Sequence, residues 1–141
     1  MLAAIIDFDQ YEDWVPYCSK GKLVEKANDS TYYFYQLLDI PFIKNRDLII
    51  KSIVHSGENG NFQIEMVITP TFIPVDPNAI RIDSFRALYS ITKDESSGKT
   101  VVALDNEVDP RGYVPTFALN WANRSAPHEV FTNLKAHIAR Y

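Results

Sequence analysis

The side chains that most often carry catalytic chemistry are few and scattered in this sequence. Cys18 is the only cysteine, and the three histidines, His55, His128 and His137, do not have the HExxH spacing of a zinc site. The chain has no GxSxG turn for a nucleophilic serine, no phosphate-binding P-loop, no GxGxxG turn and no pair of acids that stands out as a glycosidase dyad. The residues therefore predict neither a catalytic centre nor a metal site, and no disulfide can form within the chain.

The composition is typical of one globular domain. The chain has 141 residues, of which 46% are hydrophobic and 23% are charged. Its 8 Phe, 8 Tyr and 2 Trp supply more bulky apolar surface than a small core needs, which favours a lined cavity, although aromatic side chains also simply fill cores. The formal net charge of −4 argues against a partner such as duplex nucleic acid and against a general attraction to anionic membranes.

The sequence contains no recognisable membrane or export segment. No apolar run approaches the roughly 20 residues of a membrane span. The N-terminus has no basic stretch and reaches Asp7 too early for a signal peptide. We therefore expect a cytoplasmic protein, in which the glycosylation patterns at Asn28 and Asn123 arise by chance.

The hydrophobic periodicity predicts helices at the two ends of the chain and strands between them. Short helical segments are expected over residues 2–8 and 11–17, and a loop with three prolines is expected over residues 70–77. The alternation is clearest after the turn at 57–60, where Phe62, Ile64, Met66 and Ile68 share one face. The six expected strands cover residues 22–27, 31–38, 46–56, 62–69, 79–93 with a bulge near 85–86, and 99–108.

Residues 115–140 have a helical period. Val114, Ala118, Trp121 and Ser125 share one stripe, and Pro127 is expected to kink the helix because it removes one backbone hydrogen bond. A run of strands with helices at its ends indicates the α+β class. We therefore predict a curved antiparallel sheet with the long C-terminal helix packed over its concave face.

Four stretches resemble the START (StAR-related lipid-transfer) family. Residues 7–18 (DFDQYEDWVPYC) are similar to its D-x-x-x-Y-x-x-W-x-P stretch, and residues 41–50 (PFIKNRDLII) to its P-F-x-x-x-R-D strand entrance. Residues 109–120 (DPRGYVPTFALN) and 126–134 (APHEVFTNL) resemble the start and continuation of its last helix. The four occur in the family's order over nearly the whole chain. The resemblance implies the helix-grip fold of the Bet v 1-like superfamily, with a tunnel that holds one lipid.

The resemblance also implies a role for Arg46, which aligns with the family's cavity arginine. Its guanidinium would offer fixed donors to a lipid hydroxyl, carbonyl or phosphate. The alternative is an exposed arginine at the strand entrance, paired with Asp47. If Arg46 points inward, alternation turns Leu48, Ile50 and Ser52 inward and Asp47 outward, so Asp47 cannot be its direct partner.

Other residues are expected to line the tunnel or its mouth. Phe42 and Ile43 form an apolar tip in the loop that borders the tunnel mouth in the family, where they could enter a membrane or act as a gate; alternatively the tip is tucked into the core. Phe117 stands where the family usually has Trp. Each of the remaining candidates could instead be ordinary core packing: Trp14, Phe62, Ile64, Met66, Phe117 and Trp121.

The chain is shorter than the family's pattern at its front. Met1 falls inside the second helix of that pattern, so a helix and three strands are lacking that would extend the sheet beside residues 99–108. That last strand is then an unprotected edge, which is a template for pairing with another chain. Two chains could form a homodimer by pairing or swapping elements there, or the sequence is a truncated piece of a longer protein.

We therefore predict a single START-like domain, residues 1–141, that binds a lipid, fatty acid or sterol-like molecule and transfers it through transient membrane contact. It would be no enzyme and would need no cofactor. The first alternative is an enzyme of the polyketide cyclase or aromatase type in the same superfamily, with Arg46 and Tyr or Asp side chains polarising the substrate. The second is an interaction protein whose cavity has collapsed.

Overall fold

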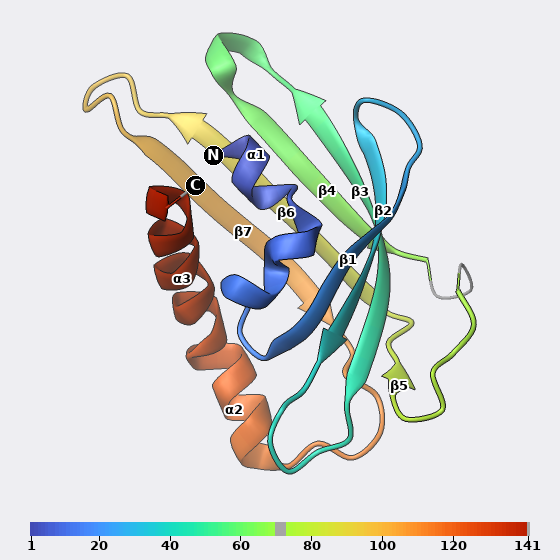
Figure 1. Ribbon diagram of the computed structural model, residues 1–141. Helices are drawn as coiled ribbons and strands as arrows, with labels where there is room; N and C mark the ends of the chain where they lie inside the picture. The colour runs from blue at the N-terminus through green and yellow to red at the C-terminus, as the bar shows by residue number, and fades with distance from the viewer. Residues whose placement is uncertain (70–72, 141) are drawn as a thin grey trace.

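The protein is an open antiparallel sheet with helices on one side of it (Figure 1). The computed structural model describes residues 1–69 and 73–140. Two short helices begin the chain, α1 (Leu2–Ile5) and the 3₁₀ helix η1 (Phe8–Asp13), and α2 (Thr116–Arg124) and α3 (Ala126–Arg140) end it. The strands are β1 (Cys18–Lys26), β2 (Thr31–Leu38), β3 (Arg46–Ser56), β4 (Phe62–Ile68), β5 (Ile80–Arg81), β6 (Phe85–Lys93) and β7 (Thr100–Val108), with the 3₁₀ turn η2 (Glu58–Gly60) between β3 and β4.

The strands follow one another across the sheet in the order β1-β2-β3-β4-β6-β7, and each pair of neighbours is antiparallel. The predicted strand over 79–93 is wrong as a single element. Its first part is β5, which pairs in parallel with the start of β3, and its second part is β6, which pairs with β4. The break at 82–84 separates β5, which pairs with the first residues of β3, from β6, which pairs with β4. Part of the loop predicted over 70–77, residues 70–72, lies outside the described residues.

All three helical predictions need correction. The segment predicted over 2–8 is α1 alone, and the segment predicted over 11–17 is the end of η1 followed by turns. The C-terminal helix is divided at Ser125 into α2 and α3, and Pro127 stands in the first turn of α3. A proline there loses no hydrogen bond, since the first N–H groups of a helix have no partner within it. None of the described helices is long and apolar enough to cross a membrane.

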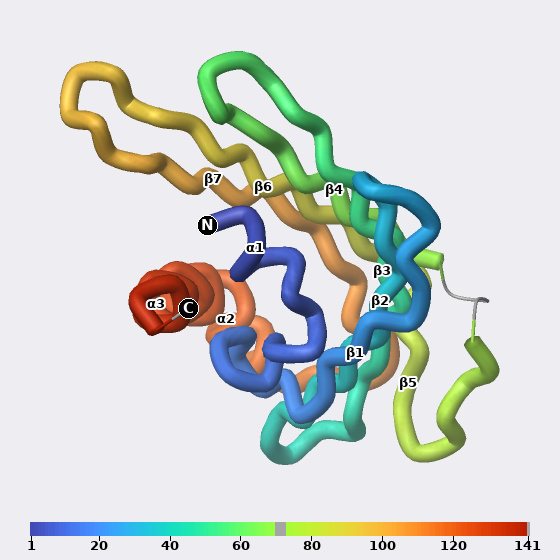
Figure 2. Tube along the Cα trace, turned by 45° about the horizontal axis from the view of Figure 1, so that its top comes forward, coloured from blue at the N-terminus to red at the C-terminus, as the bar shows by residue number. Residues whose placement is uncertain are grey.

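The helices cover the concave face of the curved sheet, and the N-terminal segment lies between the sheet and α3 (Figure 2). Aromatic rings fill this region: Phe8 stacks on Phe34 with ring centres 4.1 Å apart, and Tyr11 meets Trp14 edge to face at 5.0 Å. Asn133 of α3 donates a hydrogen bond of 3.1 Å to the carbonyl of Trp14. One end of the concave face is therefore closed by protein, which leaves the other end for a cavity.

β7 is an edge of the sheet, as the strand pattern predicts. It pairs with β6 on one side, and no strand among residues 1–69 and 73–140 pairs with its other side. Val101 and Val108 are exposed along it. Homodimerisation through this edge stays a prediction, which the molar mass in solution would test.

Candidate ligand-binding site

A cavity of about 200 Å³, called here the central cavity, lies between the concave face of the sheet and helices α2 and α3. Alternation positions its walls, because inward residues of β3, β4, β6 and β7 follow one another at every second position. Leu48 and Ile50 come from β3, Met66 from β4 and Tyr89 from β6. The other lining residues are Tyr11, Val15, Pro16, Phe34, Gln36, Leu38, Ile82, Phe85, Ala87, Leu104, Asn106, Val108, Trp121, Ala126 and Val130. None of these described lining residues carries a formal charge.

A second cavity of about 180 Å³, called here the end cavity, lies under the loop that joins β2 to β3 and beside α2. Three side chains, Leu38, Ile82 and Val108, line both cavities and so stand between them. The rest of the end cavity is lined by Ile40, Ile43, Arg46, Pro110, Val114, Ala118, Leu119, Ala122 and Asn123. The two cavities form an interrupted path from the middle of the concave face to the end of the molecule.

Arg46 is buried at the start of β3 and borders the end cavity. Its guanidinium donates to main-chain carbonyls: Nε to Pro110 at 3.0 Å, Nη2 to Arg111 at 2.6 Å and to Tyr113 at 3.3 Å, and Nη1 to Lys44. Burial lowers the pKa of Arg46 from its ordinary value. The three bonds to Pro110, Arg111 and Tyr113 hold the segment before α2 against β3. The contact between Arg46 and a ligand stays a prediction.

Gly112 makes this close approach possible. Its φ of +64° lies in the left-handed region that glycine adopts without strain. A Cβ added there would stand 3.2 Å from Arg46 Nη2 and 3.0 Å from Ile80 Cδ1. The glycine therefore lets the 109–115 segment pass over the guanidinium.

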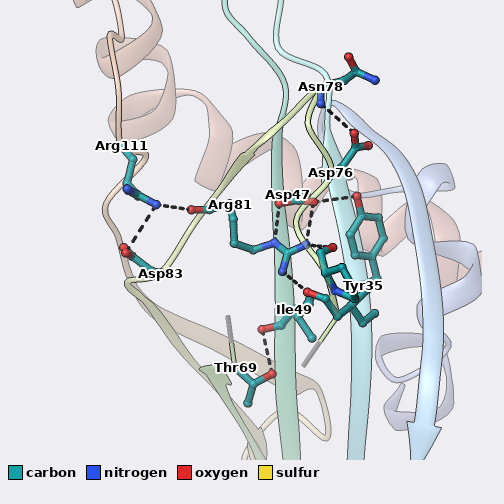
Figure 3. A network of polar contacts seen from close by, with 11 residues as sticks. Tyr35, Asp47, Ile49, Thr69, Asp76, Asn78, Arg81, Asp83 and Arg111 are labelled. Atoms are coloured by element: carbon teal, nitrogen blue, oxygen red, sulfur yellow. Dashed lines mark hydrogen bonds and ion pairs between the residues drawn. The ribbon is translucent and has the colours of Figure 1, made fainter. Parts of the chain in front are cut away.

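Asp47, the neighbour of Arg46, points to the convex face as alternation predicts. It is fully buried there, and its carboxylate accepts hydrogen bonds from Arg81 Nε at 2.7 Å and from the Tyr35 hydroxyl at 3.0 Å (Figure 3). Burial and this carboxylate raise the pKa of Tyr35 well above its ordinary value. The predicted alternative, an exposed Arg46 paired with Asp47, is therefore wrong, because the partner of Asp47 is Arg81.

Six of the predicted site residues border one of the two cavities. Leu48, Ile50, Met66 and Trp121 line the central cavity, and Ile43 and Arg46 line the end cavity. Ser52 of β3, which was also predicted to point inward, is buried. Its hydroxyl has no hydrogen-bond partner among the described residues.

The other predicted residues line neither cavity. Ile64 is fully buried in the core, and Phe62 packs against that core from a half-buried position. Trp14 lies between Tyr11 and His137, with ring centres 5.0 and 6.3 Å away. Ligand contact by these three residues stays a prediction, and the structure gives each of them a packing role.

Aromatic side chains are exposed around the end cavity. Phe42 is 91% exposed at the tip of the β2–β3 loop, and its ring meets Phe117 of α2 edge to face at 6.2 Å. Phe117 and Tyr113 are also exposed, and Tyr17 contacts Trp121 with ring centres 4.9 Å apart. The alternative of a loop tip tucked into the core is therefore wrong for Phe42, whereas Ile43 is half-buried and lines the end cavity.

Several lining residues lie outside the predicted set, above all Tyr89 of β6 and Leu104 and Asn106 of β7. The same period of two that marked 62–68 continues through 85–91 and 102–108, so this signal is present in the sequence. Burial raises the pKa of Tyr89 to about 12. The Tyr11 hydroxyl donates to the carbonyl of Ile5 at 2.8 Å, and burial raises its pKa well above the ordinary value.

A further depression of about 400 Å³ lies on the convex face beside the Asp47–Arg81 pair. Its lining includes Lys20, Lys22 and Asp76. A hydrophobic ligand would leave these charged groups poorly solvated, so the concave side is the better candidate.

Comparisons with known proteins support this fold. No protein-family model matches the sequence, and no curated protein matches it. The structure is similar to a fragment of the STAR-related lipid transfer protein of Xanthomonas axonopodis, with a TM-score of 0.84, 20% identity, and coverage of 98% of this chain and 77% of that one.

Two human proteins are similar as well. They are STARD10, with a TM-score of 0.83 and 15% identity, and StAR-related lipid transfer protein 5, with 0.75 and 14%. This chain is covered to 99% in both cases but spans 57% of the STARD10 chain and 71% of the other. At such identities the likeness shows the fold, which is a START-like helix-grip.

Proposed function

We propose that this chain binds a lipid or sterol-like molecule in the central cavity and carries it between membranes. The observation that carries the proposal is the cavity itself, which lies between sheet and helices and has an uncharged, mostly apolar lining among the described residues. Each Å² of apolar ligand surface buried there would contribute about 25 cal/mol. The likeness of the fold to lipid-transfer proteins supports the same proposal.

We further propose that the exposed aromatic tip contacts the membrane. Phe42, Tyr113 and Phe117 lie beside the end cavity, and aromatic rings are favourable at a membrane–water interface. The formal charge of −4 makes a general electrostatic attraction to anionic lipids a weak contribution, so contact would depend on insertion of these side chains. A ligand would then enter through the end cavity and reach the central cavity when Leu38, Ile82 and Val108 move aside.

We propose that no reaction accompanies binding. The titratable side chains that line the central cavity among the described residues are Tyr11 and Tyr89. Burial raises the pKa of both, which keeps them protonated at neutral pH and unsuited to act as a general base. No feature of the cavity favours the polyketide cyclase alternative.

Extraction of the purified protein followed by mass spectrometry tests the proposal. We expect a hydrophobic molecule to be recovered repeatedly, and a panel of lipids to displace the dye Nile red. The variant Ala87→Phe should reduce binding, because Ala87 is buried and lines the central cavity. Ala103→Phe is the matched control on an exposed position of β7. Recovery of no lipid together with no binding across the panel would contradict the proposed function.

A further inference from the structure

The charge of the cavity lining restricts the ligand, on the premise of the proposed function. None of the described residues around the central cavity is charged, so a buried carboxylate or phosphate would find no counter-ion there. Arg46 borders only the end cavity, and four of its N–H groups are already donated to carbonyls. Burial of an unpaired anion is costly, so the lining favours an uncharged molecule.

Most polar groups of the central cavity already have partners. The Tyr11 hydroxyl donates to Ile5, the Gln36 side chain hydrogen-bonds with Cys18, and Trp121 Nε1 donates to Glu129 at 3.4 Å. Tyr89 and Asn106 differ from these, because neither side chain has a hydrogen-bond partner among the described residues.

The position of Tyr89 makes its hydroxyl available to a ligand. The residue is 8% exposed and lines the cavity, so little solvent reaches it. The hydroxyl oxygen keeps some contact with water, and a ligand oxygen that replaces this water would form a hydrogen bond worth about 1 kcal/mol.

The register of β6 and β7 brings the side chains of Tyr89 and Asn106 close together on the concave face. Tyr89 is paired with Leu104, and Asn106 with Ala87, so Tyr89 and Asn106 are diagonal neighbours on the concave face. Diagonal neighbours on an antiparallel pair are within reach of aromatic and long side chains. One hydroxyl or carbonyl oxygen between them could accept from the Tyr89 O–H and from the Asn106 amide.

The volume of the two cavities restricts the size of the ligand. The central and end cavities measure about 200 and 180 Å³. A liquid water molecule takes about 30 Å³, so together they hold roughly a dozen non-hydrogen atoms. That is enough for one short chain or a small ring system and too little for a two-chain phospholipid.

We propose that the ligand is an uncharged, single-chain or small-ring lipid of about this size, whose hydroxyl or carbonyl oxygen is bound by Tyr89 and Asn106. The proposal assigns polar recognition to β6 and β7, and the apolar body of the ligand to Leu48, Ile50 and Met66.

Competition with Nile red tests it, using decan-1-ol, decanoate at pH 8, undecane and phosphatidylcholine. We expect decan-1-ol to bind at least tenfold more tightly than decanoate. Tyr89→Phe and Asn106→Leu should each weaken decan-1-ol roughly fivefold to tenfold, which is the effect of one hydrogen bond, and leave undecane unchanged. Thr92→Val removes an exposed hydroxyl on β6 that lies outside both cavities and is the matched control. Urea unfolding checks that each variant is folded.

The outcomes separate this proposal from the function on which it rests. Equal affinity for decan-1-ol and decanoate, or no effect of both cavity variants, would overturn the proposed recognition while binding itself stands. Stoichiometric binding of phosphatidylcholine in place of decan-1-ol would overturn the size class. If no probe binds, both the recognition and the proposed function fail.

Discussion

Asp47 and Arg81 form a buried ion pair on the convex side of the sheet, where the pair holds β5 beside the start of β3. Arg81 Nε lies 2.7 Å from Asp47 Oδ1, and Arg81 Nη2 lies 3.2 Å from Asp47 Oδ2 (Figure 3). The Arg81 side chain is 5% exposed and the Asp47 side chain is 0% exposed. The Arg81 guanidinium also donates to the carbonyls of Ile73 and Pro74. This pair therefore covers β3 on the side opposite the cavity and leaves its inward side chains free to form the cavity wall.

Removing one partner of this pair should be costly. Arg81→Met would leave the Asp47 carboxylate buried without its counter-ion, and we expect the free energy of unfolding to fall by about 3–5 kcal/mol. Urea unfolding measures this. The double variant Asp47→Asn with Arg81→Met removes both charges and should be more stable than Arg81→Met alone. Equal stability of the single and double variants would contradict a strong coupling between the two residues.

Arg46 should be important for stability in a different way. Arg46→Met leaves the carbonyls of Pro110, Arg111 and Tyr113 without their donor, and we expect a loss of about 3 kcal/mol in the free energy of unfolding. Arg46→Lys should recover only part of it, because one ammonium cannot match the planar fork of a guanidinium. Urea unfolding of both variants checks the stability, and Nile red competition on the folded protein checks the predicted ligand contact. Full stability of Arg46→Met would contradict the anchoring role.

Gly21 should not tolerate a side chain. It lies on β1 directly under η1, and an added Cβ would stand 2.7 Å from Tyr11 Cβ and closer still to the Phe8 carbonyl oxygen. Gly21→Ala must therefore push η1 away from the sheet, which we expect to cost about 2–3 kcal/mol. Thermal unfolding measures the loss. Gly98→Ala is the steric control, since nothing lies within 4 Å of its added Cβ and only its φ of +72° is strained.

Local sequence patterns predicted most strands of the sheet, but not the division of residues 79–93 into β5 and β6. The period of two correctly marked 31–38 and 46–56, and it marked 62–69, which ends one residue after β4. Alternation within one strand is a local signal, so it can be seen without knowing the partner strands. The division of 79–93 could not be predicted, since it depends on Asp47 and Arg81, which are 34 residues apart. Pro127 predicted a kink in the last helix, and the structure has a break at Ser125 that places Pro127 in the first turn of α3.

The sequence predicted several apolar residues that line the central cavity, but it did not predict the polar residues Tyr89 and Asn106. Leu48, Ile50 and Met66 follow from alternation alone. The inward position of Arg46 was also predictable, but three of its four acceptors lie more than 60 residues later in the chain. Tyr89 and Asn106 follow the same alternation, yet a sequence does not reveal which inward residues the N-terminal aromatic rings leave uncovered.

The tyrosine in the cavity should affect stability at alkaline pH. Burial raises the pKa of Tyr89 to about 12, above the ordinary value near 10. The folded state then holds this proton more tightly than the unfolded chain, so the contribution is complete below pH 10 and is lost as the pH rises toward 12. We expect the native chain to lose about 1 kcal/mol of unfolding free energy relative to Tyr89→Phe between pH 9 and pH 11. A constant difference would contradict the raised pKa.

Phe42 should favour membrane contact at the expense of stability. Its φ of +70° lies in the left-handed region, which costs a residue with a Cβ about 1 kcal/mol, and its side chain is 91% exposed. Phe42→Gly relieves this strain but adds freedom to the unfolded chain, so we expect stability to be unchanged or raised by up to about 1 kcal/mol. Flotation with phosphatidylcholine vesicles should nevertheless detect weaker binding. Asn59→Gly is the matched control, because Asn59 also has positive φ but lies in η2, between β3 and β4. Equal vesicle binding by both variants would contradict a role of the Phe42 tip in membrane contact.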